Sequence, residues 1–211
     1  QTNATGVNGE QQVFAQLQHP AARAGSALYA NNGRLYVHGG QQADGAMLAD
    51  LWAFDTSSRQ WSWWHGDTLF NRSGVFGLRQ QAAAHLFPGA KYNMSYFTLN
   101  NKFYVLSGQG IDSTGMPTTT ADGWQYDPAT GQWAWYWGEA NMQKKGRYGS
   151  PGVWSSNNIP GPRKQAVSWQ WLRKFYLFGG YGYDSRGKMG YLNDLWEWNP
   201  QARQWRWLSG A

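Results

Sequence analysis

The feature that most constrains this chain is an internal repeat, because copies of one motif recur along its 211 residues at nearly constant intervals. Asp50-Leu51-Trp52 is followed, at intervals of 72, by Asp122-Gly123-Trp124 and Asp194-Leu195-Trp196. Two further sets recur at intervals of 68 or 72: Trp61, Trp133 and Trp205; and Pro20 with Arg23, Pro88 with Lys91, and Pro160 with Arg163. A fixed period predicts stacked copies of one supersecondary unit rather than one irregular domain.

Each copy has the pattern of four short strands joined by tight turns. In the first copy we expect the strands at residues 25–29, 35–38, 51–54 and 60–64. Asn31-Asn32-Gly33 separates the first two strands, and Asn-Gly supplies the positive φ values that a two-residue hairpin turn requires. Four antiparallel strands in a repeated unit are typical of the blade of a β-propeller.

Double glycines close the second strand at Gly39-Gly40 and Gly179-Gly180, an aromatic residue lies on the third strand, and a Trp lies on the fourth. In these features the chain resembles the kelch family, and the resemblance covers all three copies. It implies an all-β segment of a kelch-type β-propeller, made of three four-stranded antiparallel blades. The second copy departs from the pattern, because Ser107 replaces the first glycine.

Residues 1–211 are predicted to form one kelch-like propeller segment. The repeat is longer than the usual ~50 residues of a kelch unit, and the excess is placed in long links before each blade. The blades are expected at about 20–65, 88–137 and 160–208, and the links at 1–19, 66–87 and 138–159.

Three blades do not close a ring, because a propeller typically has about four to eight. Two apolar sheet faces would stay open, and large apolar patches are rarely exposed on a soluble monomer. Gln1 aligns with Asn141 and Ala211 with Glu139, so the end of the chain is in phase with its beginning. We expect either half of a six-bladed propeller, completed by a further copy of the chain, or one period of a longer array. Gln1 is then a mature N-terminus after signal removal or the edge of a longer chain.

The recurrent Trp residues are interpreted as blade core, packed between neighbouring blades: Trp52, Trp61, Trp124, Trp133, Trp196 and Trp205. One cation and one carboxylate also recur in each copy, which predicts a structural ion pair in every blade: Arg23 with Asp50, Lys91 with Asp122, and Arg163 with Asp194. The alternative is that the three cations form a basic ring at the mouth of the central channel.

Signals for catalysis are weak. The absence of cysteine excludes disulfides, thiolate metal sites and cysteine nucleophiles, together with the copper and cysteine-linked tyrosine of the galactose oxidase relatives. The four histidines, His19, His38, His65 and His85, have no spacing typical of a zinc site. No carboxylate pair of the glycosidase kind is singled out. We predict no catalytic residue, no metal and no cofactor, and therefore no enzyme.

Three sequons for N-glycosylation occur, at Asn3, Asn71 and Asn93. Asn3 and Asn71 are 68 residues apart and fall at matched places in two links, whereas Asn93 lies close to an innermost strand. Asn71 and Asn3 are therefore the better candidates for a glycan. The sequons favour a secreted, extracellular glycoprotein.

The net charge is +6, but the basic residues are dispersed and no nucleic-acid-binding motif accompanies them. Weak attraction to a glycan or an anionic matrix is expected instead of nucleic-acid binding. No run approaches the roughly 18 apolar residues that cross a bilayer, so membrane insertion is not expected.

Three classes of function remain. The favoured one is a non-catalytic structural or protein-interaction module that presents long loops in an extracellular assembly. The second is a lectin-like propeller that binds sugars with exposed aromatic residues such as Trp63, Trp64, Tyr136 and Trp154. The third is a propeller enzyme that acts on a glycan.

Overall fold

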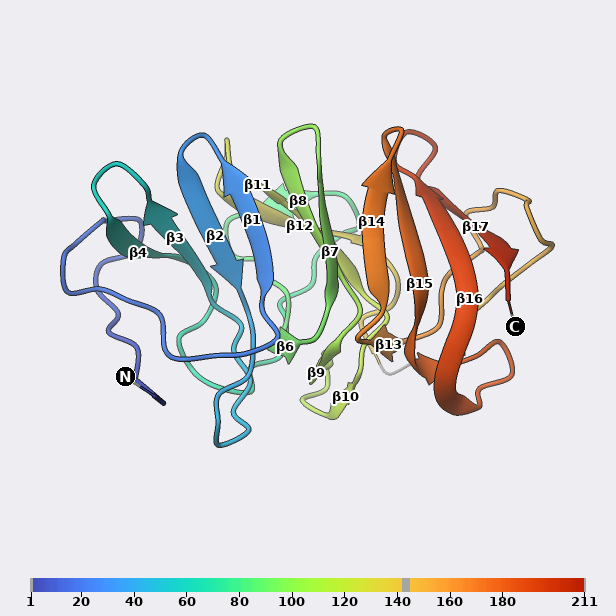
Figure 1. The fold of residues 1–211 in the computed structure, drawn as a ribbon, viewed down its shortest axis with the longest axis horizontal. Helices are drawn as coiled ribbons and strands as arrows, with labels where there is room; N and C mark the ends of the chain where they lie inside the picture. The colour runs from blue at the N-terminus through green and yellow to red at the C-terminus, as the bar shows by residue number, and fades with distance from the viewer. Residues whose placement is uncertain (1, 142–144, 211) are drawn as a thin grey trace.

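The computed structural model describes residues 2–141 and 145–210, and it contains three antiparallel blades that stand side by side in chain order (Figure 1). Blade 1 consists of β1 (Ala27–Asn31), β2 (Arg34–His38), β3 (Leu51–Asp55) and β4 (Gln60–His65). Blade 2 consists of β7 (Ser95–Leu99), β8 (Lys102–Leu106), β11 (Gly123–Asp127) and β12 (Gln132–Trp137). Blade 3 consists of β14 (Val167–Trp171), β15 (Lys174–Tyr183), β16 (Met189–Asn199) and β17 (Gln204–Ser209). The all-β, kelch-type blade architecture is thus confirmed.

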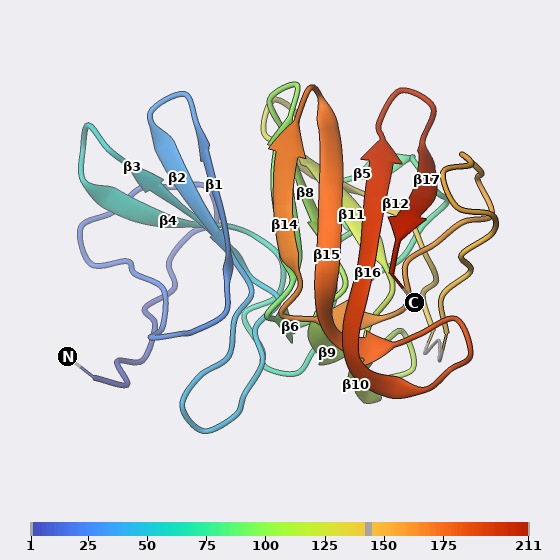
Figure 2. The same ribbon diagram turned by 45° about the vertical axis from the view of Figure 1, so that its right-hand side comes forward.

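The blades also carry short strands that the sequence pattern does not predict. β5 (Ala82–Ala83) adds a fifth strand to the outer edge of blade 2. Below blade 2, β6 (Lys91–Tyr92), β9 (Gln109–Ile111) and β10 (Pro117–Thr119) form a separate small sheet, and β13 (Arg163–Lys164) pairs with the extended β15. The innermost strands begin later than expected, because each recurrent cation lies in a segment before the strand. Figure 2 shows β6, β9 and β10 beneath the blades.

The long links fold back onto their own blades. Antiparallel bridges close an equivalent hairpin in each link: Val7 with His19, Val75 with Phe87, and Arg147 with Ile159. Further along, each link pairs with the outermost strand of the blade that follows it: Ala15 with Trp61, Ala83 with Trp133, and Ser155 with Trp205. The links, which make this repeat longer than the usual kelch unit, therefore cover the outer edge of each blade.

The double glycine has two positions with different backbone requirements. At the second position φ is 109° for Gly40, 107° for Gly108 and 92° for Gly180, which only glycine adopts without strain. At the first position φ is 64° for Gly39 and 55° for Ser107, which lies in the left-handed region that other residues can enter. The departure at Ser107 is therefore compatible with the blade.

The core lies between blades rather than within one sheet. One face of each blade packs against the opposite face of the next, so aromatic rings meet across the gap. Tyr29 of blade 1 stacks on Phe103 of blade 2, with ring centroids 5.2 Å apart. Phe97 of blade 2 stacks in the same way on Phe175 of blade 3, at 4.1 Å. No helix long and apolar enough to cross a membrane occurs in the described residues.

Candidate functional sites

Each blade contains a buried ion pair near its inner end. The donor and acceptor atoms are 2.8 Å apart for Arg23 Nη2 and Asp50 Oδ2, and 2.7 Å for the matching contacts of Lys91 with Asp122 and Arg163 with Asp194. Lys91 and Arg163 are fully buried. The structure thus brings together all three pairs named from the sequence, and the cations do not form an exposed basic ring.

The same carboxylates also explain the Asp-x-Trp motif. The indole Nε1 of the Trp two residues later donates to each of them at 2.7 Å: Trp52 to Asp50, Trp124 to Asp122, and Trp196 to Asp194. Residues i and i+2 lie on one face of a strand, so the spacing itself allows this contact. Burial disfavours the charged form of Asp194, but hydrogen bonds from Arg163, Tyr148 and Trp196 lower its pKa below the ordinary value. The motif therefore serves the architecture of the blade.

Backbone hydrogen bonds join neighbouring blades near the axis, and the pattern is repeated. Gly40 N–H donates to the carbonyl of Lys91 at 2.9 Å, and Gly108 N–H donates to that of Arg163 at 2.8 Å. Asn93 N–H likewise donates to Gly25 at 2.8 Å, and the carbonyl of Asn93 accepts from Gln165 at 3.0 Å. One kind of interface is therefore used twice in this chain.

Of the six Trp residues expected in the core, five are buried and Trp61 is only half-buried. Trp61 lies on the face of blade 1 that has no neighbour among the described residues, together with Leu28, Leu35, Val37 and Phe54. We call these five residues the open face of blade 1. Leu35 is 46% exposed, whereas the residues at the equivalent position, Phe103 and Phe175, are 0% and 1% exposed.

Blade 3 exposes the opposite kind of face. Val167, Trp169, Trp171, Tyr176 and Phe178 form it, and we call them the open face of blade 3. Trp171 is 61% exposed, and the equivalent Leu99 of blade 2, which packs against the next blade, is 7% exposed. The two open faces are the two complementary halves of the interface that is already formed twice.

The outer part of blade 3 is not apolar, which corrects the expectation of two wholly apolar faces. Glu197, buried in β16, pairs with Lys174 at 2.7 Å and with Arg206 at 2.5 Å. Trp154 of the link covers both cations, at 5.5 Å and 4.5 Å from its ring. Only the inner strands β14 and β15 therefore present the open apolar surface.

The aromatic residues expected to be exposed for sugar binding are less accessible than predicted. Trp64 is buried in the core between blades 1 and 2, so it was wrongly named as an exposed residue. Trp63 and Trp154 are half-buried. Tyr136 is also half-buried, but it lines a cleft between blades 2 and 3.

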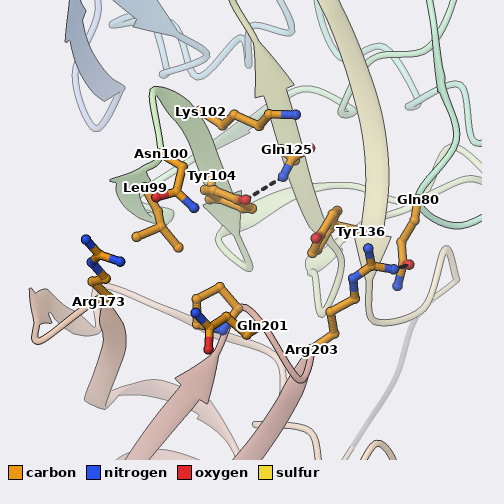
Figure 3. Close-up of a pocket in the computed structure, with 11 residues that line it drawn as sticks. Gln80, Leu99, Asn100, Lys102, Tyr104, Gln125, Tyr136, Arg173, Gln201 and Arg203 are labelled. Carbon is orange, nitrogen blue, oxygen red and sulfur yellow. Dashed lines mark hydrogen bonds between the residues drawn. The ribbon is translucent and has the colours of Figure 1, made fainter.

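Two equivalent clefts lie between neighbouring blades, at the end where the hairpin turns gather. The blade 1–2 cleft has a volume of about 580 Å³ and the blade 2–3 cleft about 490 Å³. Figure 3 shows the blade 2–3 cleft, with Tyr104, Gln125 and Tyr136 on one side and Arg173, Gln201 and Arg203 on the other. Burial, above all, raises the pKa of Tyr104 to about 12, so its hydroxyl stays neutral and accepts a hydrogen bond from Gln125. Sequence reasoning missed this cleft, because its residues come from the strands of blade 2, several turns and a link.

The sequons differ in accessibility. Asn3 and Asn71 are exposed in their links, and the carboxamide oxygen of Asn71 accepts a hydrogen bond from Met47 N–H at 3.0 Å. That contact uses the oxygen and not the nitrogen to which a glycan would be attached. Asn93 is half-buried in the seam between blades. Within residues 2–141 and 145–210, no group of three or more His, Asp or Glu side chains is placed to hold a metal ion.

Comparisons with known proteins agree with the fold. The family model for the Kelch motif matches residues 171–210, which span most of blade 3. The solved structure of YjhT superposes with a TM-score of 0.55 at 15% sequence identity. The alignment covers 97% of this chain and 54% of YjhT, so the chain spans about half the length of that protein. No curated protein matches the sequence.

Proposed function

We propose that this chain, with its three kelch-like propeller blades, is a non-catalytic interaction scaffold that docks further blades of the same kind on its two open faces. The observation that carries the proposal is the complementarity of these faces. Two interfaces between blades are formed in the chain, blade 1 with blade 2 and blade 2 with blade 3. In each, the first blade contributes the face that is open in blade 3, and the second blade contributes the face that is open in blade 1. The open faces therefore fit further blades of the same kind.

The contacts already formed indicate how a further blade would be placed. Phe97 packs on Phe175 between blades 2 and 3, and the equivalent residues on the open faces are Trp169 and Leu35. Packing the open face of blade 3 onto the open face of blade 1 in another copy would put these two side chains in contact. Burial of apolar surface contributes roughly 25 cal/mol per Å², so five large side chains on each face supply a substantial driving force.

The assembly is proposed to be extracellular, with a glycan on Asn71. Asn71 is exposed in a link, and its carboxamide nitrogen takes no part in the hydrogen bond described above. A glycan there would not obstruct either open face. Peptide mapping of native material, before and after enzymatic removal of N-glycans, tests this part of the proposal separately from the docking.

Docking is tested by analytical ultracentrifugation of the 211-residue chain over a hundredfold range of concentration. The expected result is association above the monomer mass of 23.9 kDa. Leu35→Asp in the open face of blade 1 is expected to abolish it, whereas Leu78→Asp, which changes an exposed leucine of a link, leaves it intact. A chain that remains monomeric throughout, with Trp169 and Trp171 shielded from a fluorescence quencher, would contradict the proposal.

A further inference from the structure

The blade 2–3 cleft differs in charge from the equivalent blade 1–2 cleft. Both are formed by the same hairpin turns, one repeat apart. In the blade 1–2 cleft each cation has a carboxylate: Arg34 pairs with Asp55 at 3.8 Å, and Lys102 pairs with Asp127 at 3.0 Å. The charges of this cleft are therefore balanced.

In the blade 2–3 cleft, the residues at the positions equivalent to those of the blade 1–2 cleft carry more positive charge. Asn101 and Gly131 of the second repeat are replaced, 72 residues later, by Arg173 and Arg203. Asp127 is replaced in the same way by Asn199. Two cations are gained and a carboxylate is lost at matched places.

The two new arginines are free of carboxylates. In the part of the chain that the structure describes, neither Arg173 nor Arg203 has an ion-pair partner among the Asp and Glu side chains. Arg203 is oriented by a hydrogen bond to the carboxamide oxygen of Gln80, and its guanidinium lies 5.7 Å from the ring centroid of Tyr136. It is thus held at the cleft without being neutralised.

The backbone adds an independent indication at Arg173. This residue has φ of 59° in the tight turn between β14 and β15. The same turn position is Gly33 in blade 1 and Asn101 in blade 2, which are the residues that such turns prefer. A long side chain at positive φ is less favourable than Gly33 or Asn101, so the turn itself does not explain the gain of Arg173.

The remaining lining residues define the chemistry of the ligand. Four carboxamide side chains, each able to donate and to accept, surround an aromatic floor of Tyr104 and Tyr136: Gln80, Asn100, Gln125 and Gln201. Such groups match the hydroxyls and apolar ring face of a sugar, and the two guanidiniums match a carboxylate or sulfate. Arginines also recognise acidic peptides, but the four carboxamides and the two tyrosine rings favour a sugar over a peptide.

We propose that the blade 2–3 cleft binds an acidic polysaccharide through a sugar segment that carries sulfate or carboxylate groups. Arg203, beside Tyr136, binds one anionic group, Arg173 at the other end of the cleft binds a second, and Gln125 and Tyr136 of blade 2 contact the sugar ring between them (Figure 3). The cleft volume of about 490 Å³ has room for one or two sugar residues. This inference does not depend on docking between open faces.

The test uses isothermal titration calorimetry with a sulfated disaccharide, a galacturonic acid trisaccharide, neutral maltotriose, inorganic sulfate and a glutamate-rich peptide. The test variant is Arg173→Asn with Arg203→Gly, which installs the residues of the balanced cleft and suits the positive φ of both turns. The control is Arg59→Gly with Lys188→Asn. Arg59 occupies the position equivalent to Arg203 in blade 1, also at positive φ (55°), but lies at no such cleft, and the net charge of the two variants is equal.

We expect the native chain to bind at least one acidic sugar. The affinity for that sugar should be at least tenfold weaker in the test variant and should change less than twofold in the control. Preference for the sulfated or the carboxylated probe identifies the anionic group. The proposal would be overturned if both variants bound the acidic sugar equally, or if the folded native chain bound no acidic sugar. It would also be overturned if maltotriose or inorganic sulfate alone bound as tightly as the acidic sugar, or if the peptide bound more tightly.

Discussion

At Asp122 one carboxylate accepts hydrogen bonds from both Lys91 and Trp124, and all three side chains are buried. Asp122→Asn keeps the shape but leaves the ammonium of Lys91 without a counter-charge. We expect the free energy of unfolding to fall by about 3–5 kcal/mol, measured by urea titration. The matched control is Asp127→Asn, which breaks the partly exposed pair with Lys102 and should cost less than about 1 kcal/mol. Equal losses would contradict a structural role for the buried pair.

A second prediction at this scale concerns His38, which is fully buried between blades 1 and 2. Burial, followed by the nearby charge of Lys91 and smaller contributions from Arg23 and His65, lowers the pKa of His38 from 6.5 to about 3. The unfolded chain takes up a proton near pH 6.5, but the folded chain does not until about pH 3. Stability is therefore full above pH 6.5 and falls toward pH 3, by up to about 1.4 kcal/mol per pH unit from this residue.

Replacing His38 with Leu, the residue that Leu106 places at the equivalent position of blade 2, removes this proton-binding site. Urea titrations between pH 7 and 4 should show a shallower loss of stability in His38→Leu than in the native chain. Some dependence should remain, because burial also lowers the pKa of His65. An identical slope in the two proteins would show that His38 does not contribute.

The strands show what sequence reasoning could and could not reach. Local chemistry specifies the Asn-Gly turn before β2, the spacing of the Asp-x-Trp motif and the glycine at position 40. These features recur in each copy, so the blades could be predicted from the sequence alone. The short strands β5, β6 and β13 could not, because two-residue pairings depend on which link meets which edge. The blade 2–3 cleft was missed for the same reason, since Arg173 and Arg203 of blade 3 face Tyr104 and Tyr136 of blade 2 only after the two blades pack.

Equivalent Trp residues on the outermost strands should differ in their contribution to stability. Trp133 of β12 is fully buried between blades 1 and 2, and Trp61 of β4 is half-buried on the open face. We expect Trp133→Ala to lower the free energy of unfolding by about 3–5 kcal/mol. Trp61→Ala should lower it by clearly less when the protein is dilute enough to be monomeric. Phe in place of Trp133 provides a milder variant if Ala prevents folding. Equal losses at low concentration would show that something else covers the open face.

At the scale of the whole molecule, the two open faces make association directional. In the proposed association each interface needs one face of each kind, so contact between copies would be head to tail and would either close a ring or continue as an array. Leu35→Asp disables the open face of blade 1 but leaves that of blade 3, and Trp171→Asp does the reverse. Neither variant alone has the pair of faces required for self-association.

Mixing the two variants should therefore restore one interface and no more. The intact blade 3 face of the Leu35→Asp chain would pack on the intact blade 1 face of the Trp171→Asp chain, which gives a heterodimer with the remaining two faces disabled. Sedimentation should show each variant as a monomer near 23.9 kDa and the equimolar mixture at twice that mass. Because only one interface forms, the heterodimer should dissociate at a higher concentration than a closed native assembly does. A mixture that stays monomeric, or a variant that associates by itself, would rule out head-to-tail packing of the open faces.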